Sequence, residues 1–237
     1  MINFPLDTVY LESVDSTNSY LKRIIKESGL ARGMSVMTKT QTSGRGRLGR
    51  SWLSSEGDTL CMSIAVKAPY FEGFTLLAAL AVYDALMPFC SDKNLQIKWP
   101  NDIICNSKKL SGILCERVNE YTVIGIGINV NDKAFASEIS HKATSLFLLN
   151  KEKFDIKEIF KGVNKSFEDT FSRYGFSFAK DAKAKYESLC ANLGKEVFTQ
   201  NLNGVAVGIG EDGSLLLKTD GGIIPVSSGE VAVHNIY

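Results

Sequence analysis

The chain has 237 residues, of which 44% are hydrophobic and 22% charged, proportions that are ordinary for a soluble globular protein. This length accommodates one large domain, or one domain with a small appendage. The 27 basic and 26 acidic residues leave a formal net charge of +1, so no global positive field would draw the protein onto nucleic acid or anionic lipid.

The first four fifths of the chain are expected to contain both strands and helices. Ser16 and Thr17 are typical of a helix cap, and the amphipathic helix that follows should end near Gly29. A long buried helix is expected over 73–89, and apolar residues at helical spacing predict another over 156–174, followed by one over 178–189. Strands are expected over 35–39, 60–66, 95–99, 103–105, 110–116 and 123–129.

From about residue 191 the pattern changes to short strands separated by Asn-Gly and Asp-Gly, which are strong tight-turn signals. These strands are expected over 195–197, 202–209, 214–218, 222–226 and 230–236. Five short strands in under fifty residues predict a small β-barrel appended to the main body. We therefore place a domain boundary between residues 190 and 191.

Residues 44–50, here called the Gly–Arg loop, contain three glycines and three arginines in seven positions. Glycine permits unusual backbone angles and lets main-chain N–H groups approach a ligand, while arginine forks match phosphate or carboxylate oxygens. The segment predicts a mobile anion-binding loop that closes over a polyphosphate. A solvated basic loop between two strands is the alternative.

A second motif is the run from Lys98 to Asp102, in which Pro100 interrupts regular strand pairing. An amide and a carboxylate are therefore expected at a sharp turn. A lysine at the start of the next strand, three residues before Gly112, could point its charge into the same cleft. The alternatives are a solvated hairpin tip for Lys108 and a purely turn-forming role for Asp102.

A third motif places Gly125 and Gly127 inside an otherwise apolar strand, which weakens the strand unless something approaches its backbone. Asn129 and Asn131 follow, and their amides could bind a base or a sugar. The pattern lacks the strand–loop–helix context of a dinucleotide fingerprint, and simple packing is the alternative. Residues 16–18 could likewise bind a ligand as well as cap a helix.

Five scattered cysteines without a C-x-x-C pair, four of them in apolar surroundings, predict free core thiols in a reducing compartment. Two distant histidines, His141 and His234, argue against a zinc site. The acidic N-terminus gives no sign of a signal peptide, and the apolar stretch 76–89 is too short to span a bilayer. We expect a cytoplasmic protein that binds no membrane.

Together these motifs resemble the biotin–protein ligases, in that family's order and spacing and over nearly the whole chain. The resemblance rests on Asp15-Ser16-Thr17-Asn18, Gln41 with the Gly–Arg loop through Ser51-Trp52, Lys98-Trp99-Pro100-Asn101-Asp102, Lys109-Leu110-Ser111-Gly112-Ile113-Leu114 and Gly125-Ile126-Gly127-Ile128-Asn129. It implies an α+β fold, with a mixed-sheet catalytic domain and packed helices over 1–190 and a small SH3-like β-barrel over 191–237. No helix-turn-helix pattern precedes Ser16, so the expected form is the short one without a DNA-binding domain.

The resemblance also implies a two-step reaction. Biotin and ATP, with Mg²⁺, give biotinyl-5′-AMP, and a lysine of a biotin carboxyl carrier domain then receives the biotin. Because two anions must meet, positive charge has to neutralise both. The implied catalytic residues are Arg47, Arg50 and Lys109. The implied biotin-binding residues are Ser16, Thr17, Asn18, Gln41, Gly44, Arg45, Gly46, Lys109 and Gly112. The implied ATP and adenylate set is Arg45, Arg47, Arg50, Trp52, Asn101, Lys109, Asn129 and Asn131, with Asp102 near Mg²⁺.

Two rival functions are compatible with parts of the sequence. A lipoate-type acyl ligase or transferase shares the expected fold but lacks the Gly–Arg loop. A nucleic-acid-binding protein could use the loop as a basic arm, although the balanced charge argues against it. A homodimer is compatible with the sequence. The family often ends its last strand with arginine where this chain has His234, which leaves the role of the C-terminal module open.

Overall fold

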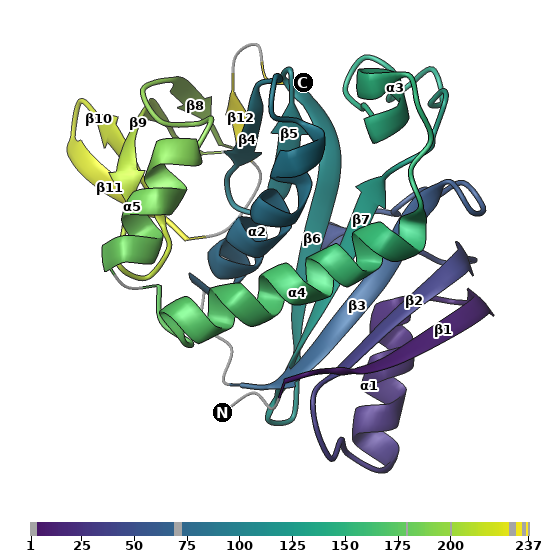
Figure 1. The fold of residues 1–237 in the computed structure, drawn as a ribbon. Helices are drawn as coiled ribbons and strands as arrows, with labels where there is room; N and C mark the ends of the chain where they lie inside the picture. The colour runs from purple at the N-terminus through teal and green to yellow at the C-terminus, as the bar shows by residue number, and fades with distance from the viewer. Residues whose placement is uncertain are drawn as a thin grey trace.

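The computed structural model describes residues 4–68, 73–178, 180–199, 201–227, 231–233 and 236 (Figure 1). A seven-stranded sheet forms the centre, in the order β1-β2-β3-β7-β6-β5-β4. Its strands are β1 (Asp7–Val14), β2 (Met34–Gln41), β3 (Thr59–Lys67), β4 (Leu95–Lys98), β5 (Asp102–Cys105), β6 (Lys108–Val118) and β7 (Tyr121–Asn129). Strand β1 runs parallel to β2 and the other neighbours are antiparallel, so the predicted mixed sheet is confirmed.

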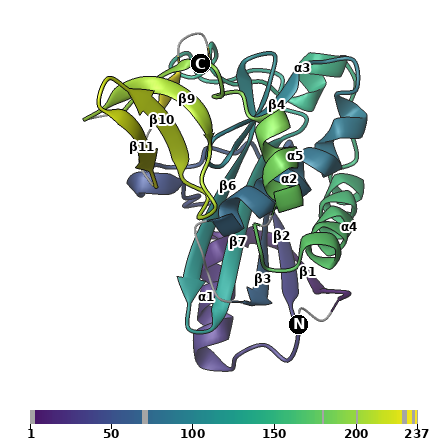
Figure 2. The same cartoon turned by 90° about the vertical axis from the view of Figure 1, so that its left-hand side faces the viewer.

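Helices cover the two faces of this sheet unequally. Helices α2 (Gly73–Leu86) and α4 (Ile156–Tyr174) lie over one face, in front of the sheet in Figure 1. Helix α1 (Thr17–Glu27) lies on the opposite face, over β2, β3 and β7, as the side view of Figure 2 shows. The remaining helical segments are η1 (Arg47–Gly49), η2 (Met87–Phe89), α3 (Leu146–Asn150) and α5 (Lys180–Leu189).

Side-chain alternation along β7 divides the two faces. Ile124, Ile126 and Ile128 belong to the large core beneath α2 and α4, so Gly125 and Gly127 face the other side. Helix α1 covers only part of that second face, through a smaller core that includes Leu21 and Ile25. The rest of the second face carries glycines and polar groups, and the candidate site lies there.

The C-terminal segment forms a separate five-stranded antiparallel sheet in the order β11-β10-β9-β8-β12. Its strands are β8 (Glu196–Phe198), β9 (Asn203–Ile209), β10 (Leu215–Thr219), β11 (Gly222–Val226) and β12 (Ala232–Val233). The prediction of a small C-terminal β module is thereby confirmed. Part of the strand expected over 230–236, including His234, lies outside the described residues.

Hydrogen bonds tie the two sheets together near the Lys98–Asp102 turn. The buried indole N–H of Trp99 donates to the carbonyl of Gly213 in the C-terminal sheet (3.0 Å). The Trp99 backbone N–H donates to the side-chain oxygen of Asn192 in the connecting segment (2.8 Å). The expected boundary between 190 and 191 stays a prediction, and contacts cross it.

Three elements, β1, η1 and α3, were not expected from the sequence. Strand β1 is an exposed edge strand with few buried side chains, and the short α3 depends on its cap, in which the Ser145 hydroxyl accepts from the N–H of Leu148. The five cysteines are free, with Cys115 partly exposed and the others buried. No helix among the described residues is long and apolar enough to cross a membrane.

Candidate active site

A cavity of about 210 Å³ opens on the second face of the central sheet, between the start of α1, the Gly–Arg loop and the Lys98–Asp102 turn. Most of the residues expected at the site line it. They are Ser16, Thr17, Asn18, Gln41, Arg45, Gly46, Arg47, Arg50, Trp52, Asn101, Asp102, Lys109 and Gly112. Segments far apart in the sequence thus contribute to one cavity.

Glycines form part of the cavity floor because neighbouring side chains leave no room for a β-carbon. Gly112 and Gly127 are paired across β6 and β7. A β-carbon at Gly127 would collide with the ring of Trp52, and one at Gly112 would lie 3.0 Å from the same ring. A β-carbon at Gly125 would collide with Asn18. Gly125 and Gly127 therefore permit close approach of protein side chains to the strand, which corresponds to the packing alternative.

The start of α1 forms one end of the cavity. The Thr17 backbone N–H donates to the side-chain oxygen of Gln41 (2.9 Å), which fixes that amide. The Ser63 hydroxyl donates to Asn18 Oδ1 (2.6 Å) and lies 2.7 Å from Thr17 Oγ1. Ser16 occupies the cap position, but its side chain makes no capping hydrogen bond. This end offers fixed donors and acceptors suited to a polar ring.

The Gly–Arg loop is folded by its own backbone. The N–H of Gly46 donates to the carbonyl of Arg50 (2.7 Å), and the N–H of Trp52 donates to that of Gly44 (3.0 Å). Between them Leu48 has a φ of 55°, in the left-handed region. At the tip, Arg47 Nη1 donates to Asn101 Oδ1 (3.0 Å), so the loop reaches across to the Lys98–Asp102 turn.

Lys109 enters the cavity from the start of β6. Its Nζ lies 2.7 Å from Asp102 Oδ1 and 5.7 Å from the centre of the Trp52 ring. Lys108 is exposed. The sequence motif from Lys98 to Asp102 and the following lysine therefore do meet in one cleft.

Positive charge dominates the lining. Among the described residues that line the cavity, five are basic and one is acidic: Arg45, Arg47, Arg50, Lys98 and Lys109, against Asp102. This excess stands out in a chain with a net charge of +1. A narrow cleft with one sign of charge concentrates oppositely charged ligands. The arrangement suits a ligand with several anionic groups.

Three expected residues do not line the cavity. Gly44 supports the base of the loop, where a β-carbon would collide with the carbonyl of Trp52. Asn129 is buried and donates to the carbonyl of Thr144 (2.9 Å). Asn131 exchanges two hydrogen bonds with the backbone of Phe154 (2.9 and 3.0 Å). Both asparagine amides therefore fix the segments that follow β7.

Several residues at or beside the cavity were not among the expected site residues, and three of them carry polar or charged side chains that bear on the site. Lys98 is 8% exposed and lines the cavity, Ser63 orients the start of α1, and Glu116 contacts both α1 and the loop. Lys98 begins the Lys98–Asp102 motif, so a basic residue in that motif was the sequence feature that could have indicated its place at the site. No local sequence pattern marks Ser63 on β3 or Glu116 on β6 as a site residue.

Comparison with known proteins identifies the family. Residues 10–131 match the biotin/lipoate A/B protein ligase family, and residues 196–233 match the biotin protein ligase C-terminal domain. The chain belongs to the biotin/lipoate A/B protein ligase family. The bifunctional ligase/repressor BirA of Bacillus spizizenii is 33% identical over 94% of this chain and 73% of its own length.

Other relatives point to the biotin branch of the ligase family. A biotin–[acetyl-CoA-carboxylase] ligase of Mycobacterium tuberculosis is 29% identical, covering 92% of this chain and 85% of its own length. The solved biotin protein ligase of Aquifex aeolicus, in complex with biotin and ATP, is 34% identical with a TM-score of 0.84. That likeness covers 96% of this chain and 98% of the other.

Proposed function

We propose that this ligase-family member activates biotin with ATP to biotinyl-5′-AMP and then transfers biotin to a lysine of a biotin carboxyl carrier domain. The observation that carries the proposal is the cavity lining, with five basic side chains and one carboxylate. The family match and the relatives named as biotin ligases support the same activity.

In the first step, a biotin carboxylate oxygen attacks the α-phosphorus of ATP and pyrophosphate leaves. Two anions have to approach each other, so their repulsion must be neutralised before the bond forms. Lys109 is positioned to lie between the carboxylate and the α-phosphate. Arg47 and Arg50, on the loop, would bind the phosphates on which negative charge develops.

At the opposite end, the fixed groups around the start of α1 suit the polar ureido ring of biotin. Gln41 and Thr17 are held by their mutual hydrogen bond, and Asn18 by Ser63. Because these donors and acceptors are already held in place, little conformational entropy is lost when a ligand binds to them. The glycines of β6 and β7 let the Trp52 ring and Asn18 lie close to the sheet, so these side chains form the floor between this end and Lys109.

The donor set is compatible with a magnesium ion carried largely by the phosphates. Mg²⁺ commonly takes one or two carboxylates together with phosphate oxygens and water. Asp102 is the carboxylate that could hold it, and no cluster of three acidic, histidine or cysteine side chains occurs in the described part of the chain. When bound, the ion would offset charge on the triphosphate.

In the second step, a neutral lysine amine of the carrier attacks the acyl carbon and AMP leaves. Biotinyl-5′-AMP is a mixed anhydride that water also hydrolyses, so excluding water protects it. The Gly–Arg loop lies over the cavity and is suited to this role. We propose a carrier domain of a biotin-dependent carboxylase as partner and a cytoplasmic location, since the free cysteines suit a reducing compartment. A homodimer stays a prediction, which light scattering of the purified protein can test.

The direct test is which acid supports the reaction. Purified protein should catalyse exchange of pyrophosphate into ATP with biotin and not with lipoate, and biotinyl-5′-AMP should be detected by mass. A carrier domain should then gain one biotin, whereas the same domain with its acceptor lysine replaced by arginine should not. Exchange with lipoate alone would assign the chain to the lipoate branch, and exchange with neither acid would overturn the proposal.

A further inference from the structure

Glu116, on β6, is a carboxylate at which three separate segments meet. Its Oε1 accepts from Lys22 Nζ of α1 (2.8 Å) and from Arg45 Nη2 of the Gly–Arg loop (2.6 Å). Its Oε2 accepts from Asn18 Nδ2 at the start of α1 (2.8 Å). The side chain is 23% exposed, so these bonds are only partly open to water.

The contacts favour a charged Glu116. Partial burial raises the pKa of its carboxyl, but the hydrogen bonds from Lys22 and Asn18, with the charge of Arg45, outweigh burial and leave the pKa below its usual range. Hydrogen bonds to an ionised acceptor are about twice as strong as neutral ones. A partly desolvated carboxylate with two cations can therefore hold the Gly–Arg loop and α1 in place.

We infer that Glu116 is a positioning residue, which fastens the base of the Gly–Arg loop and the start of α1 to β6. Glu116 is not among the residues that line the cavity, so it acts through Arg45 and Asn18. Its effect on biotin and the adenylate rests on the proposed function. Its effect on the loop does not, because the contacts join protein segments alone.

The geometry of the loop makes Arg45 an effective attachment point. Arg45 pairs with Ser51 as an isolated β-bridge, so it lies where the two arms of the loop meet. The tip is attached separately, through Arg47 and Asn101. With its base held by Glu116 and its tip by the turn, the loop spans the cavity. Loss of the basal attachment should leave the loop held by the tip contact alone, so that it opens more often.

The same carboxylate helps to orient the Asn18 amide. Asn18 Nδ2 donates to Glu116 (2.8 Å) and to the backbone carbonyl of Leu114 (3.3 Å), so its Oδ1 faces the donating hydroxyl of Ser63. Asn18 is 3% exposed and lies against Gly125, so it has little room to reorient. Glu116 thereby couples the end that we assign to the ureido ring with the loop that we assign to the phosphates.

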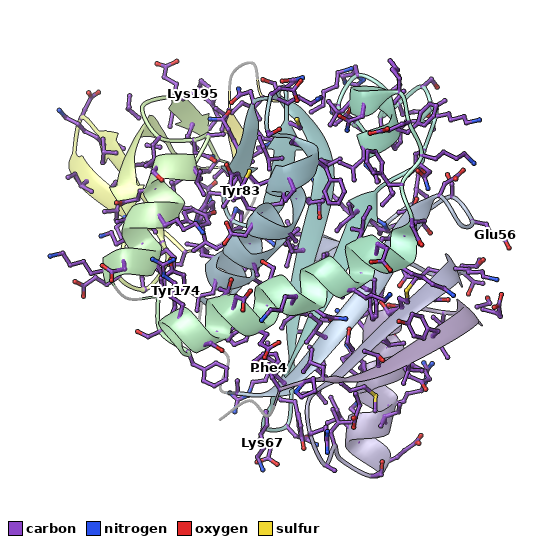
Figure 3. The ribbon with its side chains drawn as sticks, viewed as in Figure 1. Phe4, Glu56, Lys67, Tyr83, Tyr174 and Lys195 are labelled. Carbon is purple, nitrogen blue, oxygen red and sulfur yellow. The ribbon has the colours of Figure 1, made fainter. Side chains whose placement is uncertain are left out.

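The test compares Glu116→Gln with Glu120→Gln. Glu120, in the turn between β6 and β7, pairs with Lys67 (2.8 Å), and both side chains are more than half exposed. Figure 3 labels Lys67 at one end of β3 and Glu56, which follows the Gly–Arg loop, at the other. Glu120 lies on the same β6–β7 hairpin as Glu116, and Glu120→Gln also removes the charged partner of a lysine. It does so at a place away from the Gly–Arg loop.

The first readout is trypsin cleavage after Arg47 and Arg50 in the protein alone. Glu116→Gln should accelerate this cleavage roughly tenfold, as expected for loss of a hydrogen bond to a charged group. Glu120→Gln should leave the rate unchanged. Arg45 is 45% exposed in its side chain, so Arg45→Gln should fold and give the same acceleration. Adding Glu116→Gln to Arg45→Gln should then change the rate little.

The second readout is kinetic. Glu116→Gln should raise KM for biotin about tenfold and lower kcat less, because a misplaced loop and amide weaken binding before they affect chemistry. Equal cleavage rates in wild type and Glu116→Gln would overturn the inference, as would additive effects of the Arg45 and Glu116 substitutions. If wild-type protein forms no biotinyl-5′-AMP, the proposed function fails, yet the cleavage comparison still decides the role of Glu116.

Discussion

Lys109 and Gly112 lie on the same side of β6, although residues three positions apart on a regular strand point to opposite faces. The pairing of β5 with β6 explains this. Asp102 pairs with Gly112 and Ile104 pairs with Lys109, so β6 contains one more residue than β5 between these pairs. This β-bulge near Leu110 brings the Lys109 ammonium to Asp102.

Replacing Lys109 by alanine should therefore depress adenylation severely, and replacing Lys108 should not. Loss of one preorganised charge at the reacting groups typically costs on the order of 10²–10³ in rate, whereas an exposed substitution changes little. Single-turnover formation of biotinyl-5′-AMP measures both variants. Transfer from preformed biotinyl-5′-AMP should be spared more than adenylation in Lys109→Ala. A larger defect in Lys108→Ala would contradict the bulged register.

This bulge marks one limit of reading the site from sequence. Counting alternate residues back from Gly112 would have placed Lys108 in the cleft, and only the family resemblance favoured Lys109. A bulge depends on how two strands pair, which local composition does not record. Likewise, no pattern around Glu116 announces its contact with Arg45, because 71 positions of chain separate them.

Other parts of the fold were accessible because their signals are local. Apolar spacing predicted α4 at its observed bounds, Ile156–Tyr174, and turn residues predicted β11 at Gly222–Val226. Strand β1 has no such local signal, because an edge strand buries few side chains and its apolar residues do not alternate clearly with polar ones. For Asn131, the sequence predicted an amide that could bind a base or a sugar, but in the structure the backbone of Phe154 takes up both of its hydrogen-bonding groups.

Arg47→Gly should leave the fold intact and loosen the grip on the adenylate. Arg47 contacts Asn101 from a loop outside both hydrophobic cores, so its loss creates no cavity. The expected cost is about 2–4 kcal/mol of transition-state stabilisation, seen as slower adenylation and release of biotinyl-5′-AMP into solution. Rapid filtration of enzyme loaded with adenylate measures its retention. Retention and rate equal to wild type would remove Arg47 from the proposed mechanism.

Gly127→Ala should weaken biotin binding, because the added methyl group would displace the Trp52 ring from the cavity floor. Biotin titration followed by tryptophan fluorescence measures the change. Gly162→Ala is the matched control, since Gly162 lies in α4 with open space around its β-carbon position. That control should leave binding unchanged and raise stability by roughly 0.5–1 kcal/mol. Wild-type affinity in Gly127→Ala would show that the floor tolerates a side chain.

Asp132→Asn should stabilise the fold, and more so at high pH. Burial raises the pKa of the Asp132 carboxyl above 3.8, despite hydrogen bonds from Ser55 and Thr59. A raised folded-state pKa means that the ionised form costs the folded protein stability above that pKa. This cost disappears as the pH falls through the folded-state pKa towards the pKa of the unfolded state.

Urea unfolding at pH 8 and pH 4 tests this expectation. The asparagine variant should gain on the order of 1 kcal/mol at pH 8 and less at pH 4. The Thr59 hydroxyl, now 3.0 Å from Asp132 Oδ1, can still donate to the asparagine oxygen. A variant that is less stable than wild type at pH 8 would show that Thr59 and Ser55 outweigh the burial of the charge.

The bond from the Trp99 indole to Gly213 limits how the polypeptide can be divided. A fragment ending at residue 190 would lack the acceptor for a buried donor, and also Asn192, which accepts from the Trp99 backbone. Leaving such donors unsatisfied costs about 1–3 kcal/mol each, at the very turn that presents Asp102. The small C-terminal sheet therefore supports the turn that carries Asp102. The two parts of the chain should unfold in one cooperative transition.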